Sequence, residues 1–121
     1  MDWPTIAVII PTYQREAVLC DTLRSVLDQD YPAYSVVVVD QTQSHQNETQ
    51  RQLEAWAEAG KITWYPVPWA SLPAARNLGI ERSQSDLVLF IDDDVVLPPG
   101  YLYAHARTFT ERPEAAPHRH R

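Results

Sequence analysis

Three consecutive aspartates form the segment of this sequence with the most distinctive chemistry. Asp92, Asp93 and Asp94 directly follow the apolar run 87–91, Leu-Val-Leu-Phe-Ile. Aspartate is a poor strand former and neighbouring carboxylates repel one another, so the triple is unusual at this place. In an extended chain Asp92 and Asp94 point to one side, where two hard oxygen ligands suit Mg²⁺ or Mn²⁺ together with phosphate oxygens. The alternative is a solvated acidic loop or a helix cap.

Two further polar segments follow apolar runs. Residues 11–15, Pro-Thr-Tyr-Gln-Arg, come after the first run, and residues 40–42, Asp-Gln-Thr, come after a run of valines. Tyr13 is a candidate for stacking on a base or a partly buried loop aromatic. Asp40 either accepts a hydrogen bond from a nucleoside or starts a turn. Arg76, beside Asn77, can reach a phosphate or form a surface salt bridge.

The sequence offers no glycine-rich loop for a phosphate group. It contains only three glycines, and no glycine-rich loop follows any predicted strand, which excludes a dinucleotide fingerprint and a Walker loop. The net charge of −6 argues against a broad nucleic-acid-binding surface. A pyrophosphate bound by this chain would therefore need a divalent metal for most of its charge neutralisation.

Strand-like and helix-like segments alternate along the chain. Strands are expected at 5–10, 34–39, 61–65 and 87–91, and helices at 16–29, 47–59, 73–82 and 101–110. Pro11 is expected to end the first strand, Asn47 and Gln50 to form a capping-box-like pair, and Gly60 to close that helix. The four valines in succession indicate a strand covered on both faces. We therefore predict an α/β fold with a mostly parallel sheet and helices on both faces.

This predicted sheet would gather the polar segments. In open α/β sheets ligands bind outside the carboxyl ends of the strands. Residues 11–15, 40–42 and 92–94 all follow predicted strands, so they are expected to share one site. Trp64 and Trp69 flank the loop after the third strand, and the sequence alone does not distinguish a packing role from a ligand contact for them.

The remaining features concern organisation and compartment. The length of 121 residues suits one domain, expected at 1–110, followed by a polar tail at 111–121 in which a metal site at His118 and His120 is improbable. Cys20 is the only cysteine, so a reduced, cytoplasmic setting is simplest and Cys20 is expected to be a small packed side chain. We find no signal peptide and no apolar run of membrane-spanning length. An anchor beyond this chain would place it at the inner face of the cell membrane.

Four segments in series resemble the family 2 glycosyltransferases of the GT-A fold. They are 8–15 (Val-Ile-Ile-Pro-Thr-Tyr-Gln-Arg), 36–40 (Val-Val-Val-Val-Asp), 75–80 (Ala-Arg-Asn-Leu-Gly-Ile) and 89–94 (Leu-Phe-Ile-Asp-Asp-Asp). Their order and spacing also match, and the resemblance extends to about Tyr103. It implies a Rossmann-like GT-A fold, of which this chain is expected to be an incomplete part, and an inverting transfer of a sugar from a nucleoside diphosphate sugar to a hydroxyl acceptor.

The resemblance also implies roles for individual residues. Asp92 and Asp94 match the family's metal-binding DXD pattern, with Mg²⁺ or Mn²⁺ as the cofactor. Pro11 and Tyr13 would line the base pocket, and Asp40 would help to hold the nucleoside. The full set expected to bind the donor is Pro11, Thr12, Tyr13, Arg15, Asp40, Gln41, Arg76, Asn77 and Asp93.

Two departures from the family pattern bear on function. The family has a second acidic residue after Asp40, where this chain has Gln41, whose amide both donates and accepts. An inverting displacement also needs a general base for the acceptor hydroxyl, and beyond Asp94 only Glu111 and Glu114 are candidates. We therefore expect the isolated chain to bind donor but to be inactive in transfer.

Two other functions remain as alternatives. One is a nucleotide-binding module without catalytic activity. The other is a receiver-like signalling domain, which would need an acidic pair after the first strand and a lysine late in the chain. This sequence has Pro-Thr-Tyr after that strand, and its one lysine is Lys61, so the receiver-like alternative ranks low.

Overall fold

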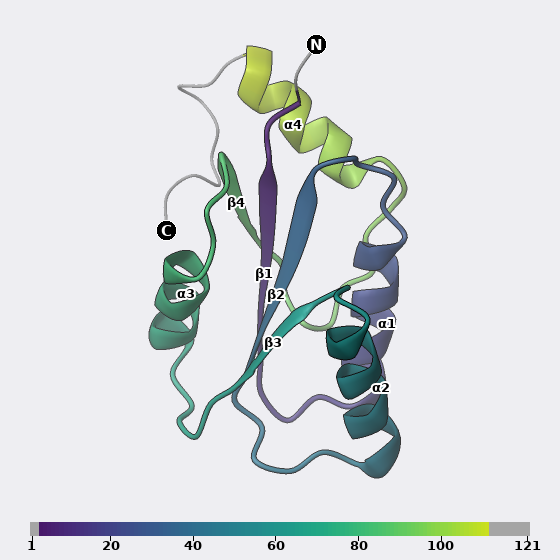
Figure 1. Cartoon of the computed structure of the whole chain (residues 1–121), viewed down its shortest axis with the longest axis vertical. Coiled ribbons are helices and arrows are strands. Elements are labelled where there is room, and N and C mark those ends of the chain that lie inside the picture. Colours follow the sequence, from purple (N-terminus) through teal and green to yellow (C-terminus); the bar gives the residue numbers. More distant parts are fainter. Residues whose placement is uncertain (1–2, 112–121) are drawn as a thin grey trace.

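Strands and helices alternate through residues 3–111, the part of the chain that the computed structural model describes (Figure 1). In chain order the elements are β1 (Ile6–Thr12), α1 (Ala17–Leu27), β2 (Tyr34–Asp40), α2 (Asn47–Glu58), β3 (Thr63–Pro66), α3 (Leu72–Glu81), β4 (Leu87–Phe90) and α4 (Tyr101–Glu111). This is the predicted order, and most boundaries fall within about two residues of the predicted ones.

The strands form one parallel sheet in the order β3-β2-β1-β4. β1 pairs with β2 from Ile6↔Tyr34 to Thr12↔Asp40, and with β4 from Ile6↔Leu87 to Ile9↔Phe90. The valine run of β2 is buried on both faces, as its lack of alternation predicted. The predicted α/β fold with a mostly parallel sheet is confirmed.

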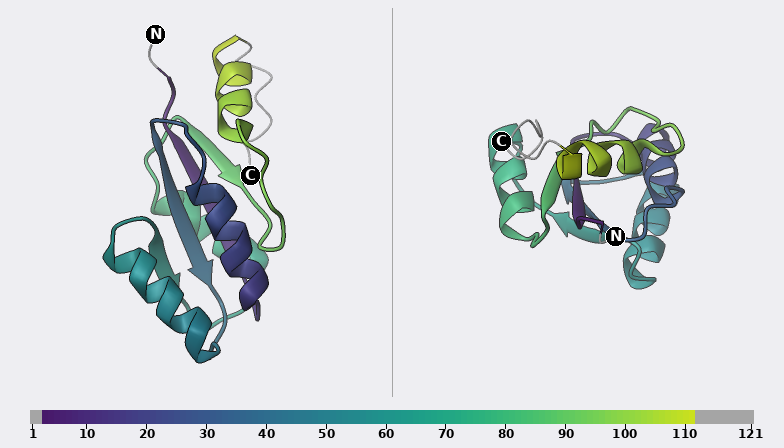
Figure 2. Two further views of the ribbon diagram at one scale, coloured as in Figure 1. Left: turned by 90° about the vertical axis from the view of Figure 1, so that its right-hand side faces the viewer. Right: turned by 90° about the horizontal axis from the view of Figure 1, so that it is seen from above.

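Helices cover both faces of this sheet (Figure 2). α1, α2 and α4 pack on one face around a core that includes Leu23, Leu53 and Leu102. α3 packs alone on the other face, where Ala75 meets Ile9 and other side chains of the sheet. α1, α2 and α3 each follow a strand and run back from the carboxyl edge of the sheet, so the loops that precede them gather at that edge (Figure 1).

α3 lies unusually close to β1 because of a glycine. A Cβ atom built on Gly79 would stand 2.4 Å from Cγ2 of Ile9, a distance that real Cβ contacts do not reach. Only a residue without a side chain fits there unless the helix moves outward. The position of α3, and of the residues at its first turn, therefore depends on Gly79.

β1 does not end at Pro11, which corrects the prediction from the sequence. The strand continues to Thr12, and the pairing Pro11↔Val39 is part of the β1–β2 ladder. The carbonyl of Thr12 accepts from the backbone of Gln41 in β2's continuation, whereas the carbonyl of Ile9 accepts from Ile91 on the β4 side. Alternation along the strand turns the backbone of Pro11 toward the β4 side beyond that last bond, where no N–H is needed.

The predicted cap of α2 is also wrong. Asn47 is already helical, Gln46 is the N-cap, and no side chain of the helix itself caps it. Instead, Oε1 of Glu16, from the loop before α1, accepts from the backbone N–H of Gln46 at 2.9 Å. Glu16, which is distant in sequence, therefore takes the capping role that was predicted for Asn47 and Gln50. The other end agrees with the prediction, because Gly60 adopts a positive φ of 75° there.

Three further sequence expectations concern burial and the chain's end. Cys20 is buried, and that burial raises the pKa of its thiol, in keeping with a packed side chain. None of the helices within residues 3–111 is long and apolar enough to cross a bilayer. α4 extends to Glu111, the first residue of the predicted tail, while the rest of that tail, with Glu114, His118 and His120, lies outside the described residues.

Candidate functional site

A cleft of about 520 Å³ opens at the carboxyl edge of the sheet. The strand order runs from β1 to β2 to β3 in one direction and then returns to β4 on the other side of β1, so the order reverses between β1 and β4. Ligand sites of open α/β sheets lie at such reversals. The cleft brings together most of the predicted residues: Pro11, Thr12, Tyr13, Arg15, Gln41, Arg76, Asp92, Asp93 and Asp94.

Asp93 points back onto the end of β1. Its Oδ2 accepts from the hydroxyl of Thr12 at 2.9 Å, and its Oδ1 accepts from Nε of Arg15 at 3.3 Å. β4 ends at Phe90, and a turn begins at Asp93, so the triple is not the extended segment assumed from the sequence. The turn separates the roles of the carboxylates, because Asp93 is occupied by protein donors while its two neighbours are exposed.

Asp92 and Asp94 are the two open carboxylates of the cleft. Among the described residues, Asp94 forms one ion pair, a long one with Nη2 of Arg15 at 3.9 Å. Within residues 3–111 no group of three or more His, Cys, Asp or Glu side chains is arranged to hold a metal. Two carboxylates fit Mg²⁺ or Mn²⁺ nonetheless, because such ions commonly keep waters and take their remaining ligands from substrate phosphates.

The first turns of α3 supply the opposite wall of the cleft. Arg76 is exposed there, with its guanidinium carbon 5.6 Å from the centroid of the Phe90 ring. Ser71 is the N-cap of α3, and its hydroxyl accepts from the backbone N–H of Ala74 at 3.3 Å. Ser71 was not predicted as a cap, although a serine two residues before a proline is a recognisable signal for the start of a helix. Asn77 is exposed on α3 but does not line the cleft.

Asp40 lies beneath the site and does not line the cleft. Its side chain is 1% exposed. Oδ1 accepts from the backbone N–H of Thr42 at 3.1 Å, and Oδ2 accepts from the indole Nε1 of Trp64 at 2.9 Å. The bond to Thr42 is the turn-starting contact that the sequence offered as the alternative role. A direct contact between Asp40 and a nucleoside stays a prediction, and the geometry favours an indirect, supporting role.

His45 joins Asp40 to Glu16. Its ring is 2% exposed; Nε2 lies 2.6 Å from Oδ2 of Asp40, and Nδ1 lies 3.0 Å from Oε2 of Glu16. Carboxylates only accept, so both contacts are satisfied when both ring nitrogens carry protons. Burial alone lowers the pKa of His45, but the hydrogen bonds and charges of the two carboxylates outweigh it and raise the pKa above its ordinary value.

None of the contacts between Glu16, His45 and Asp40 was predicted from the sequence. Burial acts to raise the pKa of Glu16, but the hydrogen bonds from Gln46, His45 and Thr49 lower it overall. Glu16 and His45 are 29 positions apart, and neither lies in a motif. No local signal pairs them, because only the packing of the loop before α2 against the start of α1 brings them together.

Gln41 is held by both ends of its amide. Its Nε2 donates to the carbonyl of Thr12 at 3.2 Å, and its Oε1 accepts from the backbone N–H of Ser71 at 2.6 Å. These partners fix which atom is oxygen and which is nitrogen. Gln41 thus ties the end of β1 to the start of α3, and it retains one N–H and one lone pair.

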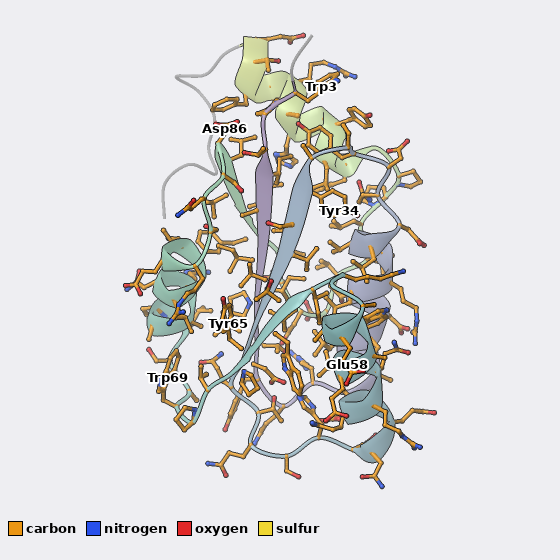
Figure 3. All side chains as sticks on the ribbon, in the orientation of Figure 1. Trp3, Tyr34, Glu58, Tyr65, Trp69 and Asp86 are labelled. Atoms are coloured by element: carbon orange, nitrogen blue, oxygen red, sulfur yellow. The ribbon has the colours of Figure 1, made fainter. Side chains whose placement is uncertain are left out.

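A second hollow, of about 400 Å³, adjoins the cleft. Tyr13, Gln41 and Ala70 line both spaces. The hollow lies among the loops that follow β1, β2 and β3, and Figure 3 labels Trp69 on the last of these loops, between β3 and α3. This position resolves the ambiguity of the two tryptophans: Trp64 belongs to the Asp40 network, and Trp69 is an exposed wall of the hollow.

Two solved structures share this architecture. The S. aureus TarS 1-349 structure in complex with UDP-GlcNAc superposes with a TM-score of 0.75 at 26% sequence identity, over 88% of this chain and 31% of that one. The mannosyltransferase PcManGT from Pyrobaculum calidifontis, in complex with GDP-Man and Mn2+, superposes with a TM-score of 0.69 at 26% identity, over 81% and 30%. The Rossmann-like GT-A fold implied by the resemblance is confirmed.

Sequence comparison agrees with the structural one. An N-acetylglucosaminyltransferase of Mesorhizobium japonicum is 33% identical over 103 residues, which make up 83% of this chain and 24% of that enzyme. The chain thus spans about a third or less of the length of these relatives. The model of the family described as glycosyl transferase family 2 matches residues 7–120, nearly the whole sequence. The chain is therefore a member of glycosyltransferase family 2 and has the GT-A fold.

Proposed function

We propose that this chain binds a nucleoside diphosphate sugar with a divalent metal and serves an inverting transfer of the sugar to a hydroxyl acceptor. The observation that carries the proposal is the meeting of two open carboxylates, Asp92 and Asp94, with Arg15 and Arg76 around one cleft. Carboxylates for a metal and guanidiniums for phosphate oxygens are the charges that a metal diphosphate needs. The relatives solved with UDP-GlcNAc, and with GDP-Man and Mn2+, support the same ligand class.

Each charged residue would act on the departing diphosphate. Asp92 and Asp94 would hold the metal, which when bound supplies a Lewis acid that stabilises the negative charge of the leaving group. Arg76 stands free of carboxylate partners in the described part of the chain and faces the cleft, so it can bond phosphate oxygens. Asp93 would act as a positioning residue, because it orients Arg15 and the end of β1 through two hydrogen bonds.

The acceptor hydroxyl needs a base, and the described residues favour none. Glu111 ends α4, which lies at the end of the sheet opposite the carboxyl edge (Figure 1). This position favours a second candidate function for the isolated chain: donor binding without transfer. We therefore expect the 121-residue chain to bind nucleoside diphosphate and to show no measurable sugar transfer.

Calorimetry with and without Mn²⁺ tests the proposal. Exchange of both Asp92→Asn and Asp94→Asn should abolish Mn²⁺-dependent binding of UDP and GDP, because the two open metal ligands are lost. Asp28→Asn with Asp30→Asn is the matched control, since it makes the same charge change at exposed positions beyond the far end of α1. Equal metal-dependent affinity in the Asp92/Asp94 double variant and the control would refute the metal assignment.

A further inference from the structure

Arg15 belongs to a segment that forms no regular structure of its own. Residues 13–16 connect β1 to α1 and are neither helical nor extended in a strand. Arg15 nevertheless has a defined place in the cleft, where its Nε donates to Oδ1 of Asp93 at 3.3 Å. Its position therefore depends on the contacts that hold its two neighbours in the chain, Gln14 and Glu16.

Both neighbours are anchored to the end of β2 and the loop that follows it. Gln14, whose positive φ of 55° is uncommon for a residue other than glycine, donates its backbone N–H to Oγ1 of Thr42 at 2.8 Å. The backbone N–H of Thr42 in turn donates to Oδ1 of Asp40 at 3.1 Å. On the other side, Glu16 contacts His45 at 3.0 Å, and His45 contacts Oδ2 of Asp40 at 2.6 Å. The two lines of contact meet at one carboxylate, so they form a closed ring of hydrogen bonds around the backbone of the arginine.

This ring is complete only while His45 carries a proton on each nitrogen, because both of its partners are carboxylates and carboxylates only accept. In the described part of the chain, the ionisable groups that act on His45 are Asp40 from β2 and Glu16 from the loop before α1. The neighbouring elements contribute the indole of Trp64 from β3, which bonds Asp40, and the hydroxyl of Thr49 from α2, which bonds Glu16. Neither of these two groups titrates near neutral pH. The state of the ring therefore depends on the proton of one imidazole.

Loss of one proton from His45 would break the contact with Glu16 and keep the contact with Asp40. A neutral imidazole has a single N–H. The side chain of Asp40 is 1% exposed, so water cannot replace a donor that it loses, whereas the side chain of Glu16 is 23% exposed and can be hydrated. The remaining proton therefore stays on the Asp40 side, and the ring opens at the residue next to Arg15.

We propose that His45 is a positioning residue, which holds Arg15 in the cleft while its ring is doubly protonated and releases residues 13–16 when it loses a proton. His45 itself does not line the cleft, so it acts through the backbone on both sides of the arginine. The inference rests on the proposed function in one respect, namely that Arg15 helps to bind the diphosphate of the donor. The affinity for the donor should then be highest at low pH and fall as pH rises through the folded pKa of His45, which the two carboxylates raise.

Calorimetry with UDP or GDP and Mg²⁺, at a series of pH values from about 6 to 9, measures this dependence. The reference is His45→Gln, which keeps an N–H donor but does not titrate, so the ratio of the two affinities cancels the titration of the nucleotide itself. The wild-type protein should bind more tightly than this variant by about 2- to 12-fold at the low end, the equivalent of one hydrogen bond of ~0.5–1.5 kcal/mol, and equally at the high end.

Two exchanges of glutamate for glutamine test the route through Glu16. Glu16→Gln removes one of the two charges that stabilise the protonated imidazole, so the pH dependence should move to lower pH while His45 remains in place. Glu58→Gln is the matched control, because it makes the same change at an exposed position at the other end of α2 (Figure 3). The control should follow the wild-type protein at every pH.

Nuclear magnetic resonance supplies readouts that a merely structural role would not change, and Mg²⁺ suits it because the ion is diamagnetic. Binding and protonation are linked, so saturating nucleotide must raise the pKa of His45 by the logarithm of the measured fold-change. The pKa of His105, on α4 at the opposite end of the sheet, should not respond (Figure 1). In the free protein, the exchange protection of the backbone N–H groups of Gln14 and Gln46, which donate to Thr42 and Glu16, should fall as His45 loses its proton.

The outcomes distinguish the inference from the proposed function. Nucleotide binding that leaves the pKa of His45 unchanged would overturn the inference. So would equal protection of Gln14 and Gln46 on both sides of the His45 titration, whether or not a nucleotide binds. Absence of Mg²⁺-dependent binding of UDP and GDP at every pH would instead overturn the proposed function, and the exchange measurement would still decide whether His45 holds residues 13–16.

Discussion

Replacing Gly79 by alanine is expected to destabilise the protein, against the usual effect of that exchange in a helix. Alanine is favoured over glycine in a helix interior by ~0.8–1.0 kcal/mol. Here, however, the added Cβ would stand 2.4 Å from Cγ2 of Ile9, with Cδ1 and Cγ1 of the same side chain at 3.0 and 3.2 Å. Forcing one extra carbon into a packed core costs ~1–3 kcal/mol. The difference is a net loss of up to about 2 kcal/mol in the free energy of unfolding.

The partner of this contact offers a direct control. Ile9→Ala removes the three atoms that would meet the new Cβ, at its own cost of ~2–5 kcal/mol. In that background Gly79→Ala should stabilise the protein by ~1 kcal/mol, because only the helix preference remains. The effect of one exchange would therefore change sign between the two backgrounds.

Urea denaturation of the four proteins of this cycle, followed by far-ultraviolet circular dichroism, measures both effects. The variants should shift the midpoint without a change of slope. A gain of ~1 kcal/mol from Gly79→Ala in both backgrounds would refute the reasoning, because α3 would then not be held against β1 at this point. α3 carries Arg76 into the cleft, so an outward shift of the helix should also weaken nucleotide binding.

Two further predictions concern pH and association. The pKa of His45 is raised in the folded state, so its stabilising contribution is complete below the unfolded pKa of ~6.5 and is lost as pH rises through the folded pKa. The urea midpoint of the wild-type protein should therefore fall over that pH window, and the midpoint of His45→Gln should change less. Parallel curves of midpoint against pH for the two proteins would contradict this. Within residues 3–111, β4 pairs on one side only, and its four residues are all apolar. The chain should therefore self-associate at micromolar concentration in size-exclusion chromatography with light scattering, less so after Val88→Lys, and a wild-type monomer would disprove an open edge.

Local sequence determined the elements and their order. The periods of the apolar residues distinguish strands from helices, and the alternation of the two restricts the sheet to a parallel arrangement. Parallel strands bring their carboxyl ends to one edge, so segments 11–15 and 92–94 were expected at the same edge of the sheet. The pairing of β1 with β4 makes them neighbours there. For this reason Tyr13, Arg15 and the three aspartates, which line the cleft, were predicted from the sequence alone.

Long-range packing decided which groups are available to a ligand. The sequence left Asp40 as either a nucleoside contact or the start of a turn, and in the structure its oxygens are held by Thr42, Trp64 and His45. Asp93 differs from its neighbours because Thr12 and Arg15, 81 and 78 positions earlier in the chain, donate hydrogen bonds to it. Trp69 faces Tyr13's hollow because the loop after β3 returns to the edge of the sheet before α3 begins.

The features that the sequence predicts and those that only the tertiary structure decides differ in the range of the interactions on which they depend. Secondary structure and strand ends depend on side chains a few positions apart, and these are visible in a linear sequence. The hydrogen-bond partners of a buried carboxylate depend on which backbone segments pack together. The Glu16–His45–Asp40 network demonstrates this, because it joins the loop before α1, the loop before α2 and the end of β2. The sequence by itself therefore determined where the candidate site is expected, and only the tertiary structure decided which of the side chains there are left without protein partners.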